Sequence, residues 1–139
     1  MLKNQVTRLI IIFTSILLAT TPNILLGNNE IIFQNLKYLA NSPSIGNATI
    51  LGLSNEGIQN VIIPKEINIG GFIYVVTDIA EYAFSNSQIS TIQLPNTIKN
   101  IGKFAFYKNE LVDVNLLEGV VSIGDFAFYQ CSALNDLVI

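Results

Sequence analysis

The chain has 139 residues, of which 50% are hydrophobic and 12% are charged, and its formal net charge is -3. This composition suits one modest globular domain and is too apolar for a disordered chain. The single cysteine and the absence of histidine exclude an intrachain disulfide, a zinc site built from Cys and His, and a His-dependent catalytic triad. The acidic balance provides no basic surface for nucleic acid, so no nucleic-acid partner is expected.

The acidic side chains and the one cysteine give little support for catalytic chemistry. The Asp and Glu residues are scattered singly, with neither the spacing of a calcium loop nor a convergent pair. With no histidine in the chain to activate it, Cys131 is interpreted as a buried structural thiol rather than a nucleophile. We therefore expect no enzyme, no metal site and no cofactor.

Residues 1–27 have the layout of a secretory signal peptide. A short basic start precedes an apolar run from Leu9 to Ala19, and small and polar residues follow. Cleavage is expected after Ala19 or Gly27. The alternative is a retained membrane anchor, but the polar residues at 20–23 interrupt the apolar run before it reaches spanning length. We expect a secreted or cell-surface protein that contacts a membrane only if this segment is uncleaved.

Residues 28–76 are predicted to form a β-rich N-terminal cap. The stretches "IIFQNLKYLA" and "NATILGLS" are interpreted as two strands on either side of a loop. The segment "INIGGFIYVV" alternates on both sides of Gly70 and Gly71, which is typical of a β-hairpin. A cap of this kind shields the open end of a repeat array from solvent.

From residue 56 to residue 139 the sequence is repetitive. The phrases "IAEYAF", "IGKFAF" and "IGDFAF" begin at residues 79, 101 and 123, a constant spacing of 22. Each unit also contains an apolar-x-x-apolar-x-apolar core, which at this period is typical of a leucine-rich-repeat solenoid. We therefore predict a mainly β solenoid of about 22-residue coils, with one short parallel strand per coil and short turns or helical turns.

The recurring phrase assigns structural roles to its residues. Phe84, Phe106 and Phe128 are expected to supply the largest buried area in each coil. Gly102 and Gly124 are interpreted as permitting a tight bend before the A-F turn. Tyr107 and Tyr129, which follow the A-F pair, have two interpretations: they form an exposed aromatic strip, or they simply cover the edge of a coil.

The stretch "ISTIQLPNTIKNIGKFAF" and the ending "IGDFAFYQCSALNDLVI" resemble the BspA-like class of leucine-rich repeats. The unit of that family reads approximately L-x-x-I-x-I-P-x-x-V-x-x-I-G-x-x-A-F-x-x-C, and the resemblance covers about residues 56–139. The departures are local: Ser87 and Asn109 stand where Cys131 matches the family cysteine, and Leu117 replaces Pro. The resemblance implies a surface-exposed or secreted protein of a host-associated microbe, with a role in adhesion and no catalytic residues.

Alternation along the predicted strands places two columns of side chains on the outward face of the solenoid. The first column is Asn60, Thr91, Asp113 and Asp136, and the second is Ile62, Gln93, Asn115 and Val138. Solenoids commonly bind partners on an extended strand face. This face is therefore the candidate site for a host extracellular protein or a protein on a neighbouring cell, and the alternative is a solvated face without a partner.

The chain stops at Ile139, where the repeat pattern would place a Pro next. The repeat array is therefore expected to be incomplete at its C-terminal end, which leaves Leu134, Leu137 and Ile139 open to self-association. Two functions follow from these observations. The first is a non-catalytic protein-binding or adhesion module, and the alternative is a purely structural N-terminal fragment of a longer array with no ligand of its own.

Overall fold

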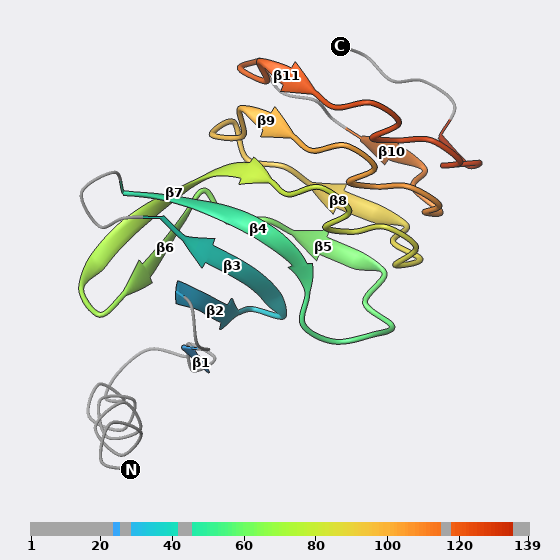
Figure 1. Ribbon diagram of the computed structural model, residues 1–139. Coiled ribbons are helices and arrows are strands. Elements are labelled where there is room, and N and C mark those ends of the chain that lie inside the picture. Colours follow the sequence, from blue (N-terminus) through green and yellow to red (C-terminus); the bar gives the residue numbers. More distant parts are fainter. Residues whose placement is uncertain (1–23, 26–28, 42–45, 115–117, 135–139) are drawn as a thin grey trace.

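Figure 1 shows the computed structural model of the protein, which describes residues 24–25, 29–41, 46–114 and 118–134. Most of the predicted signal peptide lies outside these residues. The described part of that segment is β1 (Ile24–Leu25), which pairs antiparallel with β2 (Glu30–Phe33). None of the described segments forms a helix that is long and apolar enough to cross a bilayer.

The N-terminal part of the fold is a twisted sheet. Strands β2, β3 (Leu36–Ala40) and β4 (Asn47–Leu53) are antiparallel neighbours, and β4 then pairs in parallel with β7 (Phe72–Ile79). Strand β6 (Glu66–Ile69) forms a hairpin with β7 through Gly70 and Gly71, which have φ of 58° and 90°. Side chains of β4 alternate between buried and half-buried, because one face of the sheet covers the core.

The repeats add one coil after another to this sheet. Strands β5 (Asn60–Ile62), β8 (Thr91–Gln93) and β10 (Asp113–Val114) pair in parallel and form a three-stranded sheet. The middle residues Val61 and Ile92 are buried and their neighbours are exposed. The fold is therefore a mainly β leucine-rich-repeat solenoid with short parallel strands, which confirms the fold predicted from the period.

A second parallel ladder runs through the I-G corner of each coil. The end of β7 pairs with β9 (Asn100–Ile101), and β9 pairs with β11 (Ser122–Ile123). Each coil thus has two short strands, where the sequence pattern predicts one. A two-residue strand is too short to show alternation, so the sequence pattern did not indicate this second strand. This ladder joins the coils to β4 and the N-terminal sheet (Figure 1).

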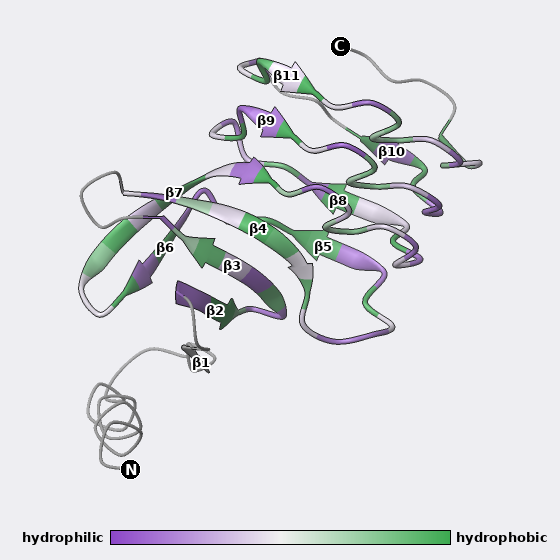
Figure 2. Cartoon of the chain, viewed as in Figure 1, coloured by the Kyte–Doolittle hydropathy of each residue, from purple (hydrophilic) through white to green (hydrophobic). Residues whose placement is uncertain are grey.

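The core lies between the two ladders and continues beneath the N-terminal sheet. Phe84 and Phe106 are fully buried and their rings stack at 5.3 Å, while Phe106 and Phe128 stack at 5.1 Å. Figure 2 shows hydrophobic and hydrophilic segments alternating along the strands that enclose this core. The recurring phenylalanine therefore forms a continuous stacked spine along the solenoid, fully buried at Phe84 and Phe106 and partly buried at Phe128.

The structure corrects the interpretation of Gly102 and Gly124. Neither has a positive φ; instead, a Cβ on Gly102 would lie 2.5 Å from the Glu81 nitrogen, and one on Gly124 would lie 2.5 Å from the Lys103 nitrogen. These glycines are needed because the preceding coil approaches too closely for a side chain. Each turn has two left-handed residues. The first precedes A-F, at Tyr82, Phe104 and Phe126 with φ of 58°, 53° and 58°, and the second lies four positions later, at Asn86, Lys108 and Gln130 with φ of 55°, 54° and 59°.

Candidate functional site

The predicted binding face is formed by the outward side chains of β5, β8 and β10. Asn60, Ile62, Thr91, Gln93 and Asp113 are all exposed, and the residues between them point into the core. The ladder brings Asn60 and Asp113 to either side of Thr91, and Ile62 beside Gln93. Asn115, Asp136 and Val138 lie outside the described residues.

This strand face is polar, with one large apolar side chain. Thr91 Oγ1 donates a hydrogen bond to Asn60 Oδ1 at 2.7 Å, which aligns the first column. Ile62 is 65% exposed, and Asp113 carries the only formal charge among the five described face residues. The five described residues suit hydrogen bonding and apolar contact with another surface, and they include no pair of titratable groups for catalysis.

Cys131 is held as a structural residue. Its side chain is buried, and Sγ donates to the Phe106 carbonyl at 3.1 Å. Burial raises the pKa of the Cys131 thiol, so the thiolate needed for nucleophilic attack is disfavoured. Within the described ranges, no group of three His, Cys, Asp or Glu residues is placed to hold a metal ion.

Asn109 makes a buried hydrogen-bonding clasp that the sequence pattern did not indicate. The residue is 2% exposed, and its Oδ1 accepts from the Ile89 N–H at 2.9 Å. Its Nδ2 donates to the carbonyls of Phe84 at 2.7 Å and Phe106 at 2.9 Å. The side chain therefore holds the backbone of two successive coils together. The only signal in the sequence is a polar residue in the column that ends at Cys131.

A ladder of aromatic rings runs along the turns. Phe104 stacks on Tyr82 at 5.1 Å and on Phe126 at 5.2 Å. The two tyrosines singled out from the sequence, Tyr107 and Tyr129, stack beside this ladder at 6.0 Å. Tyr82, Phe126 and Tyr129 are each a little over half exposed. The rings therefore form an exposed strip that also covers the coil edge, and the Tyr82–Phe104–Phe126 column was missed because the repeat pattern leaves its positions free.

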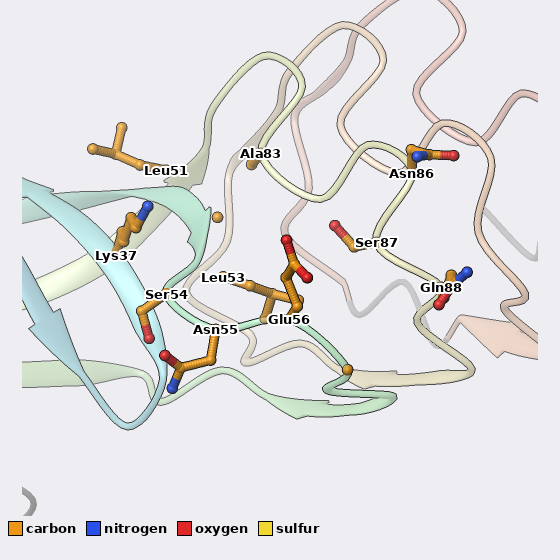
Figure 3. Close-up of a pocket in the computed structure, with 12 residues that line it drawn as sticks. Lys37, Leu51, Leu53, Ser54, Asn55, Glu56, Ala83, Asn86, Ser87 and Gln88 are labelled. Atoms are coloured by element: carbon orange, nitrogen blue, oxygen red, sulfur yellow. The ribbon is translucent and has the colours of Figure 1, made fainter.

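A polar groove of about 580 Å³ lies where the N-terminal sheet meets the first coil (Figure 3). Strand β4 lies against the first-coil turn as far as Gly52, where a Cβ would be 2.2 Å from the Ala83 carbonyl oxygen. The chain then continues into a loop at 54–57, and the space between this loop and the turn at 86–88 is the groove. No pattern in the sequence indicates the groove, because it joins segments about thirty positions apart.

The groove has mixed polar lining. Figure 3 shows Glu56 and Ser87 pointing toward each other across it, with Lys37 entering from the β3 side. The other polar residues along its walls are Ser54, Asn55, Asn86 and Gln88. Asn55 Nδ2 donates to Asn35 Oδ1 at 3.1 Å, and Ser87 Oγ makes only a long contact of 3.4 Å with the Ser85 carbonyl.

Comparison with known proteins supports the repeat assignment. Residues 54–139 match the model of the BspA type leucine rich repeat region in six copies. A leucine-rich repeat protein from Bacteroides capillosus is 27% identical, with a TM-score of 0.68 over 76% of this chain and 78% of the other. None of the curated proteins matches the chain.

Two further solved structures share the fold. A leucine rich cell surface protein from Faecalibacterium prausnitzii is 26% identical, with a TM-score of 0.65, and the match covers 78% of this chain and 30% of that one. The pneumococcal vaccine antigen PcpA is 18% identical, with a TM-score of 0.52 over 77% of this chain and 37% of its own length. The second of these shows the fold alone.

Proposed function

The chain belongs to the BspA-type leucine-rich-repeat family, and we propose that it is a non-catalytic, secreted or cell-surface module that binds proteins. Its partner would be an extracellular protein of a host or a protein on a neighbouring cell. Support for the location comes from the sequence of residues 1–27 and from the similarity to a leucine rich cell surface protein.

The binding surface in this proposal is the strand face, and the observation that carries it is the exposure of Ile62. Ile62 is 65% exposed and lies beside Gln93 on a parallel ladder, so a protein partner seated on this face would cover its apolar side chain. The surrounding groups of Asn60, Thr91 and Asp113 supply the polar rim that protein interfaces typically have. Because the ladder is held by backbone hydrogen bonds, little ordering entropy would be lost on binding.

The proposal is tested by surface plasmon resonance against a panel of immobilised extracellular-matrix proteins. The variants Ile62→Asp and Asp113→Lys are expected to weaken any binding roughly tenfold or more. Val121→Asp is the matched control, because Val121 is 79% exposed and lies outside this face. Equal binding by the parent and both face variants would exclude the strand face. Absence of binding to every protein would favour a purely structural role.

Self-association through the last coil is a second proposal. Phe126 and Tyr129 in that coil are more than half exposed, and Leu134 packs only partly against the core. Leu137 and Ile139, which the sequence also implicates, lie outside the described residues. Size-exclusion chromatography with light scattering on the parent and a Leu137→Lys variant tests the proposal: a parent dimer and a monomeric variant would support it, and a monomeric parent would contradict it.

A further inference from the structure

In the second and third coils, the backbone of the preceding turn lies against the turn of the coil and forms hydrogen bonds with it. The groove lies at the equivalent place beside the turn of the first coil. In the second coil, the Lys103, Ala105 and Tyr107 carbonyls accept from the N–H groups of the preceding turn, and the same pattern follows in the third coil. For the first coil, β4 takes the place of a preceding turn only as far as Gly52. Beyond that residue none of the segments that the structure describes continues the stacking, and the groove lies there.

The Ser85 carbonyl shows the consequence at one atom. The carbonyls of Tyr107 and Tyr129, which occupy the same turn position one and two coils later, accept backbone N–H groups from Asn86 at 2.7 Å and Lys108 at 3.0 Å. In the part of the chain that the structure describes, Ser85 O accepts only the long contact from the Ser87 hydroxyl at 3.4 Å. The Ser85 carbonyl therefore lacks the backbone N–H donor that the equivalent carbonyls of Tyr107 and Tyr129 have.

The side chains around this position match the chemistry of a peptide group. Glu56 offers acceptors, Lys37 offers donors, and Ser87 and the carboxamides offer both. The chain itself shows that this turn position can hold backbone: Asn109, one coil after Ser87, accepts from the Ile89 N–H and donates to the Phe84 carbonyl. A peptide presents the same alternating N–H and C=O groups.

Other ligand classes fit the groove less well. Lys37 and Glu56 carry opposite charges on the same cavity, so a strongly anionic or cationic ligand would be repelled by one of them. A sugar ring is usually held by a flat apolar surface against its C–H face, and none of the residues along the walls is aromatic. An extended peptide needs only the alternating donors and acceptors that the groove provides.

We propose that the groove between loop 54–57 and turn 86–88 binds an extended peptide segment of a partner protein. The N–H and C=O groups of the peptide bond to polar side chains along the walls, among them Glu56, Ser87 and Lys37. The site is separate from the strand face and does not depend on its function.

The test pans the whole chain against a phage-displayed library of short linear peptides. Enriched peptides are then measured on a Glu56→Ala/Ser87→Ala variant, and we expect roughly tenfold or more weaker binding because two hydrogen-bonding groups are lost. The matched control is Glu118→Ala/Ser122→Ala, which removes an exposed carboxylate and an exposed hydroxyl from the last coil. Thr91→Ala/Gln93→Ala on the strand face is expected to leave peptide binding unchanged.

Circular dichroism and thermal unfolding establish that each variant is folded, and Lys37→Ala provides an independent groove variant if the double variant is not. Three results would overturn the proposal. They are failure of any linear peptide to enrich, equal binding of enriched peptides by parent and groove variants, and groove-dependent binding of a neutral oligosaccharide panel in place of peptides. Loss of matrix-protein binding on the strand face, with peptide binding intact, affects only the other proposal.

Discussion

Replacing Asn109 with alanine is expected to destabilise the protein by about 2–6 kcal/mol. The substitution leaves the Ile89 N–H and the Phe84 carbonyl without their side-chain partner in a site where Asn109 is 2% exposed. Each buried backbone group left unpaired costs about 1–3 kcal/mol. The Phe106 carbonyl contributes little to this loss because it also accepts from Cys131 Sγ. Since whole domains are stable by about 5–15 kcal/mol, the expected loss is large.

A graded series separates the hydrogen bonds from the packing. Asn109→Cys retains a donor that is able to reach the Phe84 carbonyl, as Cys131 reaches the Phe106 carbonyl, but it leaves the Ile89 N–H unpaired. Its expected cost is therefore about 1–3 kcal/mol, roughly half that of alanine. Glu110→Ala, at the exposed neighbouring position, is the control and should change the free energy of unfolding by about 0.5 kcal/mol or less.

Urea unfolding followed by circular dichroism measures these free energies, with equal slopes required for comparison. A value for Asn109→Ala within about 0.5 kcal/mol of the parent would refute the clasp. So would a cysteine variant that is no more stable than the alanine variant.

Three further predictions concern the coil interior. Gly102→Ala should cost about 1–3 kcal/mol through its clash with Glu81, and a melting temperature equal to that of the parent would contradict this. Phe106→Ala should lower the free energy of unfolding by about 3–5 kcal/mol. Phe126→Ala, on the exposed strip, should lower it by about 1.5 kcal/mol or less, and urea unfolding measures the difference. Because burial raises the pKa of Cys131, thiol labelling should stay slow in the folded chain near the ordinary thiol pKa of about 8.5 and become fast in urea. Equal labelling rates in the folded chain and in urea would refute the burial. Because the thiol ionises at lower pH in the unfolded chain than in the folded chain, the free energy of unfolding should also fall as the pH rises above that value.

The repeat period predicts those features that recur in every coil. Strands β8 and β10 and the phenylalanine spine were found where the 22-residue spacing places them, because stacked coils must align their apolar columns. The same spacing identified Gly102 and Gly124 as important but gave the wrong reason. Close approach of two backbones is a property of neighbouring coils, and one coil's sequence does not contain it.

Features that occur once were not predictable from the period. The column Ser87, Asn109 and Cys131 is one position of the repeat, yet its members have three different environments. Cys131 donates to one carbonyl, Asn109 clasps two coils, and Ser87 borders the groove. Which bond each side chain makes depends on the segment that lies on the N-terminal side of its coil. For the first coil that segment is β4, and no sequence pattern indicates that β4 separates from the turn after Gly52.

This dependence on neighbours explains why the groove and the strand face differ as candidate sites. Each coil contributes one strand to the strand face. The outward residues of these strands differ from coil to coil while the backbone ladder stays the same. Binding specificity on this face would therefore be distributed over many side chains. The groove forms where a coil meets a segment of different shape, and the Ser85 carbonyl, next to the lining residue Asn86, lacks the backbone donor that the Tyr107 and Tyr129 carbonyls have in the later coils. Specific recognition of a short peptide is therefore expected at the junction with the N-terminal sheet, and recognition of a larger surface along the coils.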